Sequence, residues 1–164
     1  MLQFSDFECP FCGKFSTEIL PALQAQYIRA GRVLFAFRHL PLESHPNAEA
    51  AALAATCAAE QEKFGAFHDL VFANPKALDR NKLAQHSVSI GLDPSSYAAC
   101  LETTAPARVK ADTELARMLG VTGTPSFFIG KLGQDRQLVV RKTIKGTRPL
   151  SEFVAAMDEA LAAK

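Results

Sequence analysis

Two cysteines separated by two residues stand directly behind the first hydrophobic segment of the chain. Residues 2–7 alternate apolar and polar side chains, as a short strand does, and the CPFC motif of residues 9–12 follows at once. The proline of the motif suits the first position of a helix, because a residue there needs no partner for an N–H group. The motif therefore predicts a strand-to-helix junction, with Cys9 at the helix N-terminus and Cys12 one turn later.

The CPFC motif is compatible with three kinds of chemistry. Two thiolates at this spacing are half of a tetrahedral zinc site, which needs four ligands. The remaining cysteines, Cys57 and Cys100, stand alone and the four histidines lack metal-binding spacing, so we predict no metal. A structural disulfide within the motif would close a ring too small to contribute much stability. Thiol–disulfide exchange is the third role.

The position of the motif favours this exchange chemistry. Unpaired N–H groups and the helix dipole stabilise negative charge at a helix N-terminus and lower the pKa of a cysteine there to about 3.5–7. We therefore predict that Cys9 is the nucleophilic thiolate. Cys12 lies where its sulfur reaches back to Cys9, so it is the predicted resolving thiol.

The next part of the chain predicts a βαβ unit followed by helices. Apolar side chains recur at helical spacing up to about residue 27, with a bend or reset expected at Pro21. Residues 33–37 form an apolar run that is typical of a strand covered on both faces. Residues 46–116 have helical patterns and no convincing strand.

The last part of the chain predicts a β-hairpin and a covering helix. Residues 125–129 and 137–144 have strand patterns, with a charged loop at 130–136 between them. Residues 149–163 place apolar side chains along one face of a helix. The complete order, βαβ, helical insertion, hairpin and helix, is a thioredoxin-type α/β arrangement.

Length and charge limit the domains and partners of the chain. With 164 residues, of which 48% are hydrophobic, it can bury the core of one compact domain. We assign residues 1–45 and 117–164 to a thioredoxin-like domain, and residues 46–116 to an inserted all-helical lobe. The net charge of +1 indicates neither a nucleic acid nor an anionic membrane as a partner. Because a strand begins almost at once, we expect that a leader segment has been removed.

A second motif lies far from the first in the sequence. The segment GVTGTPSFFIG, residues 120–130, places Pro125 at the start of a strand, behind small residues. A proline cannot donate to a strand ladder, so a strand start or an edge is its usual place. Together with FSDFECPFC and FRHLPLESHPNAEAAALAA, in this order, the segment resembles the DsbA-like branch of the thioredoxin superfamily, the thiol–disulfide oxidoreductases with a helical insertion.

This resemblance implies how the site is built. It implies that the Thr124–Pro125 peptide bond is cis and packs against the CPFC pair, which Pro10 and Phe11 shape. It also implies that the exposed backbone of Thr124 pairs with an extended client peptide. Some DsbA-like proteins have a second disulfide in the helical lobe, and Cys57 and Cys100 both fall there, so they are candidates for a structural disulfide. Related domains also occur fused to membrane transporters.

The sequence departs from the family pattern at two positions. DsbA-like proteins commonly carry a buried glutamate six residues before the first cysteine, where this chain has Gln3. An amide cannot accept a proton in that role, so Asp6, Glu8 or water would have to serve. Phe11 supplies no cation to the Cys9 thiolate, so we expect a milder oxidant than DsbA itself.

Phenylalanine and histidine residues also stand near the CPFC motif and in the segment after the second predicted strand. We expect Phe7 and Phe11, beside the cysteines, to form an exposed apolar surface for unfolded clients. For His39 and His45 a capping or solvent-facing role is favoured over a role in stabilising the thiolate.

The sequence predicts a monomeric thiol–disulfide oxidoreductase. It would pass the Cys9–Cys12 disulfide to cysteine pairs of client proteins, and a redox partner would restore that disulfide. No cofactor is expected beyond the redox-active disulfide itself. We expect a periplasmic or otherwise extracytoplasmic location, with the cytoplasm as the alternative. The alternative functions are a disulfide reductase or isomerase, and a non-catalytic module that binds a peptide or a metal.

Overall fold

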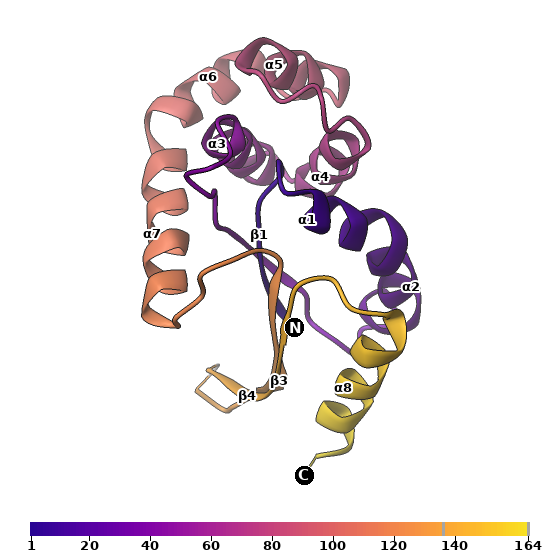
Figure 1. Ribbon diagram of the computed structural model, residues 1–164. Helices are drawn as coiled ribbons and strands as arrows, with labels where there is room; N and C mark the ends of the chain where they lie inside the picture. Colours follow the sequence, from indigo (N-terminus) through magenta and orange to yellow (C-terminus); the bar gives the residue numbers. More distant parts are fainter. Residues whose placement is uncertain (136, 164) are drawn as a thin grey trace.

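A four-stranded sheet organises the chain, and a group of helices is gathered over one of its ends. The computed structural model describes residues 1–135 and 137–163. The strands are β1 (Leu2–Ser5), β2 (Ala36–His39), β3 (Ser126–Leu132) and β4 (Leu138–Lys145). Their order in the sheet is β2-β1-β3-β4; β2 is parallel to β1, and β3 and β4 run antiparallel to their neighbours. Figure 1 shows the helical lobe at the end of the sheet where β1 leads into the first helix.

The first helical segment is continuous but irregular. It runs through α1 (Pro10–Lys14), the π-helical turn η1 (Phe15–Ile19), α2 (Leu20–Leu23) and a second π-helical turn η2 (Gln24–Ile28). Proline has no N–H group to continue an α-helical ladder, and a π-helical turn is one way to accommodate that loss. The change of geometry predicted at Pro21 is therefore confirmed as a π-helical turn on each side of α2.

The helical lobe follows β2. Its helices are α3 (Ala48–Glu60), α4 (Phe64–Ala73), α5 (Arg80–Ser89), α6 (Pro94–Glu102) and α7 (Thr104–Met118). The α/β thioredoxin-like fold with a helical insertion between β2 and the β3–β4 hairpin is thereby confirmed. The proposed domain boundary between residues 116 and 117 stays a prediction, and it falls inside α7. No helix of the described residues is long and apolar enough to cross a membrane.

Helices cover both faces of the sheet. The α1–η2 segment and α8 (Leu150–Ala162) pack on one face, where the rings of Phe15, Phe127 and Phe153 lie 4.5–5.2 Å apart between centroids. On the other face α7 contributes Ala116 to a smaller apolar cluster around Phe4. Because both faces are covered, β1 is almost wholly buried, which holds its C-terminal end in a fixed place.

The prediction for the second strand was wrong in position and in surroundings. The strand begins at Ala36 instead of residue 33, and β2 lies at an edge of the sheet. Leu34, in the predicted strand, is 68% exposed. The apolar run has another cause, since Phe35 packs with the α8 cluster while Phe37 packs with the lobe. A continuous apolar run therefore marked an edge strand contacted by two different cores.

The hairpin is longer than predicted. Residues 130–132 belong to β3 instead of the loop, with an irregularity in register between Ile129 and Gly130. A Cβ atom at Gly130 would clash with the backbone of Val139, so glycine permits the strands to approach there. Arg136, the last residue of the predicted loop, lies outside the described residues.

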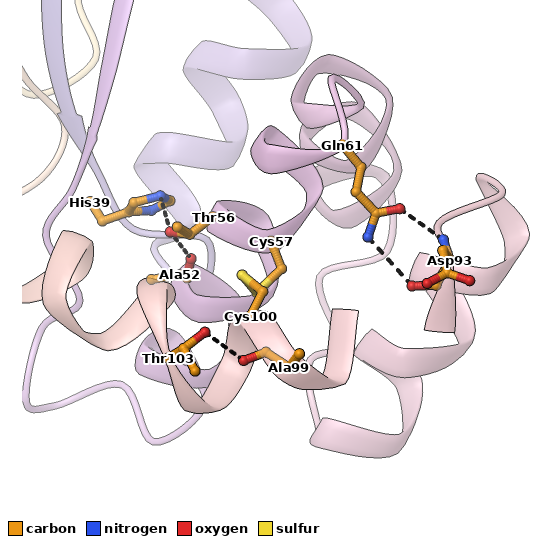
Figure 2. The surroundings of a disulfide bond; sticks show 9 residues. All are labelled: His39, Ala52, Thr56, Cys57, Gln61, Asp93, Ala99, Cys100 and Thr103. Atoms are coloured by element: carbon orange, nitrogen blue, oxygen red, sulfur yellow. Dashed lines mark hydrogen bonds between the residues drawn. A yellow bond between two sulfur atoms is a disulfide. The ribbon is translucent and has the colours of Figure 1, made fainter. Parts of the chain in front are cut away.

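A disulfide joins two helices of the lobe. Cys57 of α3 and Cys100 of α6 are bonded, with Cα atoms 5.6 Å apart. Figure 2 shows this bond together with a second link between the two helices. Gln61, which follows α3, and Asp93, which precedes α6, exchange hydrogen bonds. Both sulfur-bearing residues are buried, so the bond is part of the lobe's core.

Removing the lobe disulfide should destabilise the protein without altering its cysteine motif. In the Cys57→Ala/Cys100→Ala variant we expect the free energy of unfolding to fall by about 4 kcal/mol, because the bond closes a loop with a sequence separation of 43 residues. Urea unfolding of the two proteins, followed by circular dichroism, measures the difference. An unchanged unfolding midpoint would contradict a structural role for this disulfide.

Candidate active site

The cysteines of the CPFC motif lie at the junction of β1 and α1. Cys9 caps the helix N-terminus in an extended conformation (φ −73°, ψ 120°), and Pro10 is the first helical residue. The N–H of Cys9 donates to the carbonyl oxygen of Asp6 over 3.2 Å, which closes the turn between strand and helix. Cys9 and Cys12 are free thiols, and both belong to the core cluster that the lobe forms with this junction.

The surroundings of Cys9 favour its thiolate form. They lower the pKa of the Cys9 thiol from 9.0 to about 5. The largest cause is a hydrogen bond with the side chain of Cys12. The Thr124 side chain and the N–H groups of Cys12 and Phe11 act in the same direction, while burial opposes them. Near neutral pH Cys9 is therefore a thiolate, which is the nucleophilic form of the residue.

Cys12 has the opposite character. Burial raises the pKa of its thiol, and the hydrogen bond to Cys9 and the charge of the Cys9 thiolate raise it further. The side chain of Cys12 is 0% exposed, whereas Cys9 is 5% exposed, so Cys9 is the sulfur that another molecule can reach. The pair thus combines one ionised, accessible sulfur with one protonated, covered sulfur.

The segment before β3 faces Cys9. The Thr124–Pro125 peptide bond is cis, and the Cys9 thiol donates to the carbonyl oxygen of Thr124 over 3.5 Å. Within the described residues the buried Oγ1 of Thr124 has no hydrogen-bond partner, so its O–H can donate to Cys9 once that residue is a thiolate. The fold therefore brings Thr124 and Pro125 to the CPFC motif from the other end of the chain.

The two phenylalanines near the motif differ in exposure. Phe11 is 63% exposed, and its carbonyl oxygen accepts a hydrogen bond from the Thr147 hydroxyl over 2.6 Å. Phe7 is only 2% exposed, because its ring packs against Phe37 and Phe72. The expected apolar surface formed by Phe7 and Phe11 is therefore corrected, since Phe11 alone of the two is available to a client.

Acidic residues beside the motif tie it to the loop after β2. The buried carboxylate of Asp6 accepts hydrogen bonds from the N–H groups of Glu8 and Leu42 and meets Nδ1 of His45 at 2.8 Å. Glu8 in turn accepts from the backbone and side-chain N–H groups of Asn47, which precedes α3. The sequence offers these residues as SDFEC and SHPN and allows His45 to approach the motif, but it contains no signal for the contact between His45 and Asp6.

The position of the missing buried acid holds an unpartnered amide. Gln3 is 0% exposed, and neither its Oε1 nor its Nε2 has a partner among the described residues. The carboxylates of Asp6 and Glu8, the predicted substitutes for this acid, are engaged by contacts with the loop after β2. The Ser5 side chain and the Asp6 backbone act to lower the pKa of Cys12, against the larger effects of burial and of Cys9.

The two histidines after β2 have separate roles. His39 is buried and its Nε2 meets Thr56 Oγ1 at 3.2 Å, so the expected capping or solvent-facing role does not hold for it. Burial lowers the pKa of His39 to about 4, which keeps the ring neutral. His45 is half-buried beside Asp6, the residue whose backbone carbonyl accepts from the Cys9 N–H. Across residues 1–135 and 137–163, no three side chains of the metal-binding types are grouped as ligands.

The fold and this dithiol define a thioredoxin-like protein of the DsbA-like kind that carries a CxxC pair. The family Thioredoxin_4, described as thioredoxin, matches residues 1–140, and the chain belongs to this family.

Solved structures of DsbA-like proteins share the whole fold. α-DsbA1 of Wolbachia pipientis is 25% identical with a TM-score of 0.82, and the match covers 98% of this chain and 84% of that one. A thioredoxin-like oxidoreductase from Silicibacter pomeroyi DSS-3 is 25% identical with a TM-score of 0.80, over 99% and 86% of the two chains. BdbD of Bacillus subtilis, at 23% identity and a TM-score of 0.81 over 99% of this chain and 86% of its own, shows the same fold.

Curated relatives include parts of membrane antiporters. The Na(+)/H(+) antiporter NhaA 3 of Salinispora tropica is 34% identical over 131 residues, which are 79% of this chain and 20% of the antiporter. The antiporter NhaA of Herminiimonas arsenicoxydans is 33% identical over 130 residues, again 79% of this chain and 20% of its own length. The chain thus spans about a fifth of the length of these relatives.

Removing the Thr124 hydroxyl should make the Cys9 thiolate less stable. In the Thr124→Val variant we expect a Cys9 pKa above the value of about 5, because a side-chain hydrogen bond that favours the thiolate is lost. The pH dependence of thiolate ultraviolet absorbance in the reduced protein measures it. Thr122→Val, in the same loop but exposed, is the control and should leave the Cys9 pKa unchanged. Equal pKa values in the two variants would contradict the contact.

Proposed function

We propose that this protein is a thiol–disulfide oxidoreductase that donates its Cys9–Cys12 disulfide to cysteine pairs of client proteins. The observation that carries the proposal is the asymmetry of the pair, in which the pKa of Cys9 is lowered to about 5 and that of Cys12 is raised. A stable Cys9 thiolate favours the reduced form of the pair, and a dithiol that prefers to be reduced is an oxidant toward others.

The proposed reaction transfers two electrons from the client to the protein. A client thiolate attacks Cys9 Sγ, the Cys9–Cys12 bond breaks, and Cys12 leaves and takes up a proton. The second client thiolate then attacks the client sulfur of this mixed disulfide, and Cys9 leaves as a thiolate. The client gains a disulfide, and Cys9 and Cys12 become thiolate and thiol. A redox partner must then remove the two electrons to restore the oxidised pair.

The surroundings of the pair suit a range of clients. In this proposal Pro125 and Pro10 shape the site, while the backbone of Thr124 pairs with an extended client segment and the exposed ring of Phe11 contacts apolar client side chains. Main-chain pairing does not depend on client sequence. The protein would act as a monomer outside the cytoplasm, where disulfides in clients and in its own lobe persist.

The alternative functions of this site differ from the proposed one in the reduction potential that they require of the Cys9–Cys12 pair. A reductase or isomerase would use the same cysteines with a more reducing pair, and a binding module would hold a peptide or metal without turnover. The similarity to segments of Na(+)/H(+) antiporters adds a second setting, in which such a domain works as part of a membrane protein.

The reduction potential decides the direction of electron flow. We expect the Cys9–Cys12 pair to equilibrate with glutathione at a potential closer to about −120 mV than to about −270 mV, the values typical of DsbA and thioredoxin. The Cys57→Ala/Cys100→Ala variant, measured alongside, separates this pair from the lobe disulfide. A value near −270 mV would assign a reductase, and a pair that does not react at all would remove the enzymatic proposal.

The potential should also depend on pH in a characteristic way. Between about pH 5 and pH 9 the reduced pair holds one proton, because Cys9 stays ionised down to its pKa of about 5. We therefore expect the potential to fall by about 30 mV for each pH unit in this range, and by twice as much below it. The steeper slope throughout would mean that Cys9 is protonated at neutral pH.

A further inference from the structure

Asp6 and His45 form a charged pair next to Cys9 that disulfide transfer itself does not require. The Asp6 side chain is 0% exposed, so its negative charge has lost its contact with water. Three groups compensate for this loss: the N–H groups of Glu8 and Leu42, and Nδ1 of His45 at 2.8 Å. A carboxylate buried in this way needs donors or a cation, and His45 can be both.

The surroundings of His45 favour its protonated form. The hydrogen bond to Asp6 raises the pKa of its imidazole most, and the negative charges of Asp6, Cys9 and Glu8 add to the effect, while burial opposes it. These are the charged groups facing the ring from the β1–α1 turn. On its other side the loop continues into α3, where the carbonyl oxygen of His45 accepts from the N–H of Ala48.

The turn of Cys9 and the charged pair share one residue. The backbone carbonyl of Asp6 accepts from the Cys9 N–H over 3.2 Å, while the side chain of Asp6 holds His45. The position of the imidazole relative to Cys9 is thus fixed through a single residue. Neither residue between the two cysteines is ionisable, since they are Pro10 and Phe11.

We propose that His45, held as an imidazolium by the buried carboxylate of Asp6, is the charge partner that stabilises the Cys9 thiolate in place of a cation within the motif. Only the effect on the oxidising power of the disulfide rests on the proposed function; the pairing of His45 with the Cys9 thiolate does not. When two electrons from a client dithiol reduce the pair, Cys12 keeps one proton, one proton goes to solvent and Cys9 carries the new negative charge. The imidazolium balances that charge without giving up its proton, which favours the reduced pair and makes the disulfide more oxidising.

Titration of His45 tests the inference without any assay of activity. We expect the NMR-measured pKa of His45 to be lower in Cys9→Ser than in the reduced protein, because the variant lacks the thiolate. Coupling between two sites is reciprocal, so the decrease should equal the increase in the Cys9 pKa when the charge of His45 is lost. The ring of His86 in α5, followed in the same spectra, is the control. Equal His45 pKa values in the two proteins would overturn the inference.

Variants of the pair test its effect on Cys9. We expect His45→Gln to raise the Cys9 pKa and to shift the equilibrium with glutathione toward the disulfide by threefold to tenfold, where tenfold corresponds to about 30 mV. In an Asp6→Asn background His45 loses the counter-ion that raises its pKa most, so the further change to Gln should have a smaller effect. His86→Gln is the matched control and should leave both quantities unchanged. An equal effect of His45→Gln in both backgrounds would overturn the role of Asp6.

The two proposals can fail separately. A potential near that of thioredoxin, with a His45 pKa that still depends on Cys9, would remove the oxidase and retain the charge pair. An oxidase whose His45 pKa is independent of Cys9 would retain the function and remove the pair. Because the NMR comparison leaves His45 and Asp6 intact, it gives an answer even where substitution of the buried pair prevents folding.

Discussion

The hydrogen bond from the Cys9 N–H to the Asp6 carbonyl oxygen fixes the point at which β1 becomes α1, and the chemistry of the site depends on that point. β1 has a partner strand on each side, parallel on one and antiparallel on the other. Two ladders therefore set the position of its end to within a residue. A shift of one residue would exchange the faces of β1 and move Cys9 away from the N–H groups at the start of the helix.

The helical lobe determines which of the two sulfurs is covered. The buried side of α3 is built largely of alanine, and these small side chains share one core cluster with Phe67 and Phe72 of α4 and with both cysteines. Within this cluster Cys12 is fully covered, whereas Cys9 is 5% exposed. Burial and the neighbouring negative charge both act against ionisation of Cys12, so the covering that hides the second sulfur also keeps it protonated. The burial of Cys12 therefore explains both its low accessibility and its high affinity for a proton.

The sequence predicted the site where local rules apply and missed it where distant loops meet. Strand, Pro10 and helix follow one another along the chain, so the position of Cys9 could be predicted from helix-terminus physics alone. The approach of Thr124 and Pro125 to the motif was predicted from the resemblance, since no periodicity relates Cys9 to Thr124, 115 positions later. Phe7 was misplaced because a ring beside a reactive cysteine looks the same in sequence whether it faces a client or the lobe. The contact of His45 with Asp6 depends on where the loop after β2 returns, which side-chain patterns do not encode.

Gln3 of β1 is the position at which this chain differs from the family's buried glutamate. A buried amide without partners costs about 1–3 kcal/mol, and a protein that retains one at 0% exposure carries that cost in the core of its sheet. A carboxylate at the same depth would need donors or a cation to compensate for its charge. A neutral amide does not. The contacts that favour the Cys9 thiolate come instead from the side chains of Cys12 and Thr124 and from the N–H groups at the start of α1.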